Sequence, residues 1–140
     1  MSVKTYNAGE VSIIFAGIPF EGFADGTFVT VARDNPSFNS LVGSDGEGAR
    51  AKTNDKSGTI TCTLLQTSVT NDALSALSQL DELSGDGIGK LLVADKSGRT
   101  LAQAETAWIE KPADAEFGRE ISNREWVLKT DSLNIFIGGN

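Results

Sequence analysis

The side chains of this sequence that could do chemistry are mainly carboxylates, because the chain has no histidine and a single cysteine. Without histidine, the commonest metal ligand, the usual general base and every histidine-containing catalytic triad are excluded. Asp45, Glu47 and Asp55 lie close enough in sequence to suggest a calcium site, but their spacing is not that of an EF-hand loop. A solvated acidic loop is the preferred interpretation, and we expect no metal and no cofactor.

The glycine-rich stretch 43–48 (GSDGEG) resembles a phosphate-binding loop only in composition. No Lys-Ser or Lys-Thr pair follows at the Walker spacing, and no strand leads directly into the stretch. Asp81, Glu82 and Asp86 gather near the end of a predicted helix, where the dipole disfavours anions and favours a lysine or arginine of a neighbouring molecule. Since nothing marks a carboxylate pair for acid–base work, we predict no catalytic residues and no enzymatic activity.

Short alternating or β-branched segments indicate strands along most of the chain. The predicted strands are residues 11–16, 27–33, 58–65, 91–94, 100–105, 107–112, 123–130 and 132–137. Within 58–65, alternation points Ile60, Cys62 and Leu64 toward a core and the intervening threonines toward the other face. Cys62 is therefore predicted to be a small, unreactive core residue, and as the only cysteine it has no intrachain disulfide partner.

Residues 71–83 form the one predicted helix, because Leu74, Leu77 and Leu80 make an apolar stripe along one side. Many short strands with one helix predict a mainly β fold. We expect a single domain over residues 1–140, built as a β-sandwich or barrel with this helix at its flank.

The stretch 34–57 lies between two of the clearest strand patterns but has no sustained period of its own. A structureless segment of this length inside a compact domain is unusual, and such segments are commonly functional or disordered. Only Phe38, Leu41 and Val42 could give it a core. We predict a long extended loop, with two interpretations open: a flexible surface loop, or an arm that orders against another subunit.

The charge and the N-terminus limit the partners. Nineteen acidic against twelve basic residues give a net charge of −7, which disfavours tight wrapping of nucleic acid but allows DNA to move past without sticking. No apolar run has the length of a membrane span, and residues 1–6 lack the apolar core of a signal peptide. We expect synthesis in the cytoplasm and no membrane partner.

Five short motifs together resemble a known family. They are GFADGTF at 22–28, NDKSGT at 54–59, LQTS at 65–68, AWIEKP at 107–112 and NREW at 123–126. Their order and spacing resemble the inner tail tube proteins of contractile-tailed bacteriophages, a family whose fold is similar to that of the type VI secretion tube protein. The resemblance runs over nearly the whole chain.

This resemblance implies a non-enzymatic structural subunit of the virion tail, made in the host cytoplasm. Six copies would close into a ring, and stacked rings would form the tube through which DNA is ejected without specific binding. The implied partners are other copies of the chain, the tail sheath protein, and the tape measure and baseplate proteins. Stretch 34–57 sits where the family has a loop that reaches the next ring.

If that loop contacts the next ring, Phe38, Leu41 and Val42 are the expected apolar anchors. Basic residues of the same stretch are expected to make ionic contacts with acidic residues of the adjacent ring. The full set of predicted inter-subunit residues is Phe38, Leu41, Val42, Arg50, Lys52, Asn54, Asp55 and Lys56. An acidic inner wall would repel DNA phosphates and ease their passage.

A different function class stays open on the residues alone. The chain could be a monomeric β-sandwich binding or adaptor module, with Trp108 and Trp126 as a stacking platform for a carbohydrate. Tryptophan in an alternating strand is more often part of the core than of such a platform. The exposure of the two indoles distinguishes these possibilities.

Overall fold

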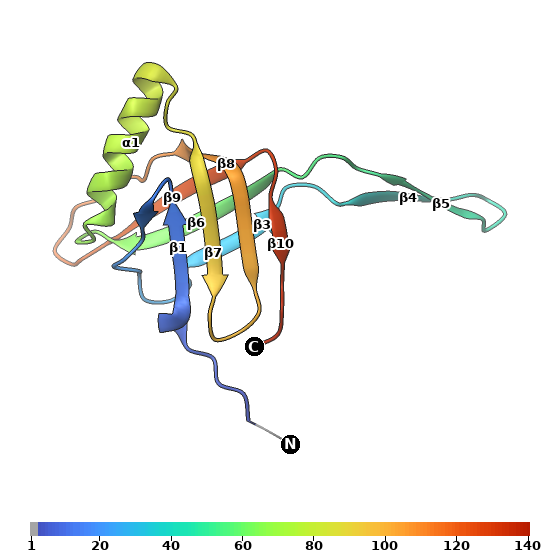
Figure 1. Ribbon diagram of the computed structural model, residues 1–140, viewed down its shortest axis with the longest axis horizontal. Coiled ribbons are helices and arrows are strands. Elements are labelled where there is room, and N and C mark those ends of the chain that lie inside the picture. Colours follow the sequence, from blue (N-terminus) through green and yellow to red (C-terminus); the bar gives the residue numbers. More distant parts are fainter. Residues whose placement is uncertain (1–2) are drawn as a thin grey trace.

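The computed structural model describes residues 3–140, so Met1 and Ser2 of the N-terminal stretch considered above lie outside the described residues. The chain is mainly β with one α-helix, as the sequence predicts (Figure 1). The elements are η1 (Ala8–Glu10), β1 (Val11–Phe15), β2 (Ile18–Pro19), β3 (Val29–Arg33), β4 (Phe38–Val42), β5 (Gly48–Lys52), β6 (Gly58–Leu65), α1 (Thr70–Ser84), β7 (Gly89–Asp95), β8 (Leu101–Lys111), β9 (Asn123–Thr130) and β10 (Asn134–Phe136).

Eight strands form one antiparallel sheet in the order β2-β1-β7-β8-β9-β6-β3, with β10 also paired to β8. The long strand β8 joins the two halves of this sheet: its first part pairs with β7 and β10, and its last part pairs with β9. Residues 100–105 and 107–112, predicted as two strands, are one strand here. A register shift against β7 leaves both Glu105 and Thr106 exposed, and this bulge lets the strand turn while keeping the same side inward.

The core lies between the two halves of the sheet. On β6, Ile60, Cys62 and Leu64 are fully buried and the alternating threonines are half-buried on the opposite face, as predicted. The same alternation along β1, β7, β8 and β9 supplies most of the rest. The main buried apolar residues are Ile13, Phe15, Leu91, Val93, Ala102, Ala104, Ala107, Ile109, Trp126, Leu128 and Leu133.

Helix α1 extends one residue beyond the predicted 71–83 at each end and stops at Gly85, whose φ of 74° is left-handed. It packs at one flank of the sheet near β2 (Figure 1). Leu74 is buried, but Leu80 and Leu83 are exposed, so the apolar stripe is only partly covered within one chain. Among residues 3–140, no helix is long and apolar enough to cross a bilayer.

Candidate functional site: the projecting arm

Residues 34–57, called the arm below, leave the body of the molecule between β3 and β6 and project far beyond it (Figure 1). Strands β4 and β5 form a two-stranded antiparallel hairpin in the arm, and all ten of their residues are exposed. The prediction of a long extended segment is confirmed, but its description as a loop without strands is wrong at these two places. Because neither side of the hairpin meets a core, its residues show no period that the sequence could reveal.

The tip of the arm is a tight turn. Gly43 and Glu47 are joined by a backbone hydrogen bond of 2.8 Å, and Gly46 has a φ of 89°. The carboxylate of Asp45 accepts a hydrogen bond of 3.1 Å from the amide of Glu47 in the same turn. Asp55 lies at the other end of the arm, and across residues 3–140 no three acidic, histidine or cysteine side chains gather as metal ligands would.

The hairpin has two chemically different faces. In the register of β4 and β5, partners that lie opposite share a face, and successive residues alternate between faces. The charged face carries Phe38, Ser40, Val42, Arg50 and Lys52. The uncharged face carries Asn39, Leu41, Ala49 and Ala51.

On the charged face, the guanidinium of Arg50 lies 4.1 Å from the centroid of the Phe38 ring. This cation–π contact places the ring and the cation together on the surface of one hairpin. Arg50 is therefore already supported within its own chain.

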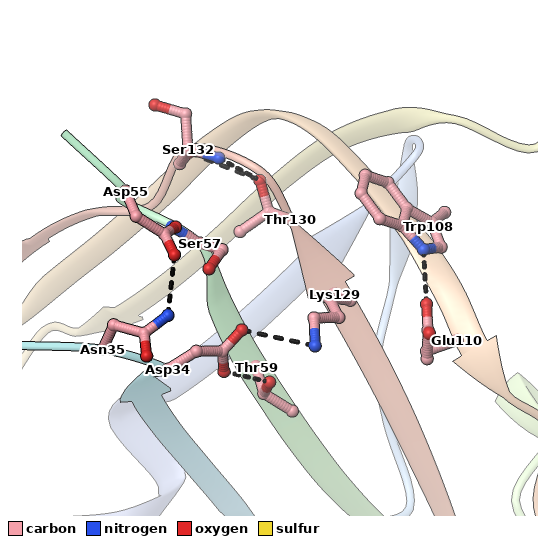
Figure 2. Close-up of polar contacts among 10 residues, drawn as sticks. All are labelled: Asp34, Asn35, Asp55, Ser57, Thr59, Trp108, Glu110, Lys129, Thr130 and Ser132. Carbon is pink, nitrogen blue, oxygen red and sulfur yellow. Dashed lines mark hydrogen bonds and ion pairs between the residues drawn. The ribbon is translucent and has the colours of Figure 1, made fainter.

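The two legs of the arm are tied to each other at its root. The amide of Asp34 donates to the carbonyl of Ser57 at 3.0 Å, and the amide of Thr53 donates to the carbonyl of Ser37 at 2.8 Å. The side-chain amide of Asn35 donates to a carboxylate oxygen of Asp55 at 2.6 Å (Figure 2). These bonds hold the hairpin strands in register where they leave the body.

A carboxylate ties the first leg to the outer face of the sheet. Asp34 accepts a hydrogen bond of 2.7 Å from the hydroxyl of Thr59 and forms an ion pair of 3.3 Å with Lys129 (Figure 2). The Thr59 hydroxyl, with a smaller contribution from Lys129, lowers the pKa of Asp34 below its ordinary value. Hydrogen bonds from Ser57 likewise lower the pKa of Asp55.

Leu133 ties the end of β3 and the second leg of the arm to the β9–β10 connection. Its carbonyl accepts two hydrogen bonds from Arg33, and its amide donates to the carbonyl of Lys56 at 2.8 Å. Its side chain is fully buried against Gly58, where an added Cβ would lie 2.4 Å from Leu133 Cδ2. Sequence reasoning missed Arg33, Asn35 and Leu133, because partners so far apart in sequence leave no local pattern.

The predicted contact residues do not form one cluster. Phe38, Val42, Arg50 and Lys52 share the charged face, whereas Leu41 lies on the other face. The remaining three residues lie at the root of the arm: Asn54, Asp55 and Lys56. The role of these eight residues in contacts between subunits stays a prediction.

The two tryptophans lie on opposite faces of the sheet, so they cannot form one stacking platform. Trp126 faces the core, is 3% exposed, and donates from Nε1 to Asn71 Oδ1 at 2.9 Å. Trp108 is paired across the strands with Lys129 on the outer face, and its Nε1 donates to Glu110 at 2.7 Å (Figure 2). The platform proposed for a binding module therefore loses one of its two residues.

Comparisons with known proteins identify a family and several relatives that this chain resembles. A family model described as bacteriophage PhiTE tail tube protein matches residues 9–138. "Structural protein ORF10" of Pseudomonas phage KPP10 is 31% identical to this chain, over 98% of the chain and 84% of its own length.

Two solved structures share the fold at 10% sequence identity. The anti-feeding prophage cap, a tube-terminating cap, superposes with a TM-score of 0.64 over 97% of this chain and 94% of its own. The sheath/tube terminator of the PVC extracellular contractile injection system, in its extended state, superposes with a TM-score of 0.62 over 98% of this chain and 100% of its own.

Proposed function

This chain belongs to the bacteriophage PhiTE tail tube protein family, a family of phage tail structural proteins, and we propose that it builds the inner tube of a contractile tail. In this function six copies close into a ring, and rings stack into a conduit through which DNA is ejected. The sheath protein surrounds the tube, and tape measure and baseplate proteins are further partners.

The observation that carries this proposal is the arm. Both faces of its hairpin are exposed in the single chain, although an isolated two-stranded hairpin is marginally stable in water. A surface of this kind gains stability when a neighbouring molecule covers it. Because the arm projects from the body, it can reach a neighbouring molecule, and in the proposed tube this neighbour is a subunit of the next ring.

Three further points support the proposed tube. In the described residues, β2, β3 and β10 each pair with a strand on one side only, and pairing between neighbours in a ring would cover such open edges. Stacking by an arm is a head-to-tail contact that does not close, so it generates a filament. The net charge of −7 supports an inner wall that repels DNA phosphates rather than binding them.

Negative-stain electron microscopy of the purified protein over a concentration series tests the proposal. We expect hollow tubes with a six-fold end view. Particles of monomer size at every concentration would instead support the monomeric binding or adaptor module. Single rings that never elongate would point to a terminal position in the tube.

A deletion of residues 44–52 tests the arm itself. It removes the tip and β5 but leaves Ser37 and Thr53, whose backbone hydrogen bond already closes the shortened loop. We expect a folded subunit, with circular dichroism and thermal unfolding close to those of the wild type, that does not form long tubes. Long tubes from this variant would refute the role of the arm.

A further inference from the structure

We propose that the uncharged face of the arm, and not the charged face, is the surface that docks on the body of a second copy of this chain. This inference rests on the proposed function, because it assigns a docking face to the arm that links stacked subunits. It assigns Leu41 to the docking face and leaves Phe38 and Val42 outside it, although all three were predicted from the sequence as apolar anchors.

The side chains of the uncharged face suit a dry contact. Leu41 is 75% exposed and lies directly across the hairpin from Ala49, and Ala51 continues the same face. The small alanine side chains leave this face flat, so another surface can approach the hairpin backbone closely. Cores of protein interfaces are depleted in charged residues, and this face has none.

The charged face is less suited to burial. Arg50 and Lys52 lie on it, and burying either cation without a partner costs more free energy than the surrounding apolar contact returns. Arg50 is also stacked on Phe38 of its own chain, so the phenyl ring supports a solvated cation instead of forming a free apolar anchor.

The distribution of charge favours a second copy of the chain as the occupant. Residues 38–52 hold two acidic and two basic side chains, so the whole net charge of −7 lies outside the hairpin. Two acidic bodies repel each other, whereas a neutral hairpin approaches such a body without net repulsion. With the uncharged face docked, Arg50 and Lys52 point away from the contact and stay in solvent, so docking does not desolvate either cation.

The root makes this docking face a preformed surface. Asn35 and Asp55 join the two legs, and Leu133 bonds to Arg33 just before the arm and to Lys56 near its end. An arm whose direction is set before assembly loses less conformational entropy on docking than a flexible loop does.

Adjacent residues of β4 provide a matched test. Leu41 and Val42 are 75% and 67% exposed and lie on opposite faces, so each of Leu41→Asp and Val42→Asp replaces an exposed apolar side chain with a carboxylate at similar exposure.

Circular dichroism checks that both subunits fold, and electron microscopy and sedimentation measure the protein concentration at which tubes form. We expect Leu41→Asp to raise this concentration on the order of tenfold or more, and Val42→Asp to leave it close to that of the wild type. Ala49→Glu, on the same face as Leu41, is expected to match Leu41→Asp.

The other outcomes would overturn the proposed docking face. In the first, Val42→Asp inhibits tube formation while Leu41→Asp forms normal tubes. In the second, both variants inhibit tube formation equally. In the third, neither variant changes it. The deletion of residues 44–52 separates this failure from that of the proposed function. If the deletion blocks tubes while the substitutions contradict the uncharged face, the arm still stacks rings, but through another surface.

Discussion

The guanidinium of Arg33 donates two hydrogen bonds to the carbonyl oxygen of Leu133, from Nε at 3.2 Å and from Nη2 at 2.8 Å. The amide of the same leucine donates to the carbonyl of Lys56 on the other leg of the arm. One residue of the β9–β10 connection therefore bonds to Arg33, which directly precedes the arm, and to Lys56 near its end. The direction of the arm is set by the body of the molecule and not by the hairpin itself.

Replacing Arg33 with alanine is expected to loosen the root of the arm. The change leaves the Leu133 carbonyl without its two charged donors, and hydrogen bonds to charged groups contribute about 1.5–3 kcal/mol to stability. We expect a loss of about 1–3 kcal/mol in the free energy of unfolding, measured by urea denaturation. Hydrogen exchange should rise at residues 34–57 while β6 and β9 stay protected.

Arg33→Lys is the matched control, because an ammonium keeps the charge but lacks the planar fork of donors. The hydrogen-exchange rate at the root in Arg33→Lys should lie between the rates in the wild type and in Arg33→Ala. Unchanged protection of residues 34–57 in Arg33→Ala would show that the root does not depend on this contact.

The sequence predicts those elements that face a core on one side. Strands 58–65 and 123–130 match β6 and β9 to the residue, because alternate side chains of both are buried. The bulge at Glu105 and Thr106 could not be predicted, since a change of backbone register leaves no mark in composition. The two residues of β2 are too few to show a pattern.

The arm shows the limit of pattern reading most clearly. Its position and extended nature follow from the sequence, but its hairpin does not, because both faces are exposed. The two faces follow only from the register of β4 with β5. Arg33 and Leu133 are 100 positions apart, so their contact depends on the whole fold.

Acid should weaken the root of the arm. The Thr59 hydroxyl and then Lys129 lower the pKa of Asp34, and Ser57 lowers that of Asp55, both from an ordinary 3.8. A carboxyl group whose folded pKa is depressed adds stability above its unfolded pKa, and this stability is lost as the pH falls through the folded pKa. The arm should therefore stay anchored at neutral pH and loosen only below pH 3.8.

An NMR titration of the side-chain carboxyl carbons from about pH 6 to about pH 2 measures this directly. Both midpoints should fall below 3.8. In Asp34→Asn, the amide signals of Thr59 should no longer shift with the titration of residue 34. A midpoint for Asp34 at or above the ordinary value would contradict the contacts at the root.

Cys62 should be inert toward thiol reagents in the folded protein. Burial raises the pKa of its thiol to about 12, and its side chain is fully buried on β6. At about pH 8 only roughly one thiol in ten thousand would be ionised, and a thiolate is the reactive form. Labelling with a chromogenic disulfide should follow the rate of unfolding and become rapid in denaturant. Rapid stoichiometric labelling of the native protein would contradict this.

Single-tryptophan variants should separate the core indole from the surface indole. Trp126→Phe removes the donor to Asn71, which connects β9 to the start of α1. Loss of this hydrogen bond at a buried site is expected to cost about 1–3 kcal/mol of unfolding free energy. Trp108→Phe removes only an exposed hydrogen bond to Glu110, so its cost should stay within about 0.5 kcal/mol.

The same variants report indole exposure by iodide quenching of fluorescence. With Trp126 as the only indole, quenching in the unassembled subunit should be weak, because the ring is 3% exposed. With Trp108 as the only indole, quenching should be stronger than with Trp126 as the only indole. Strong quenching of both indoles would contradict the placement of Trp126 in the core. Weak quenching of Trp126 in the free subunit, together with the loss of stability in Trp126→Phe, would establish that this tryptophan stabilises the fold from within the core.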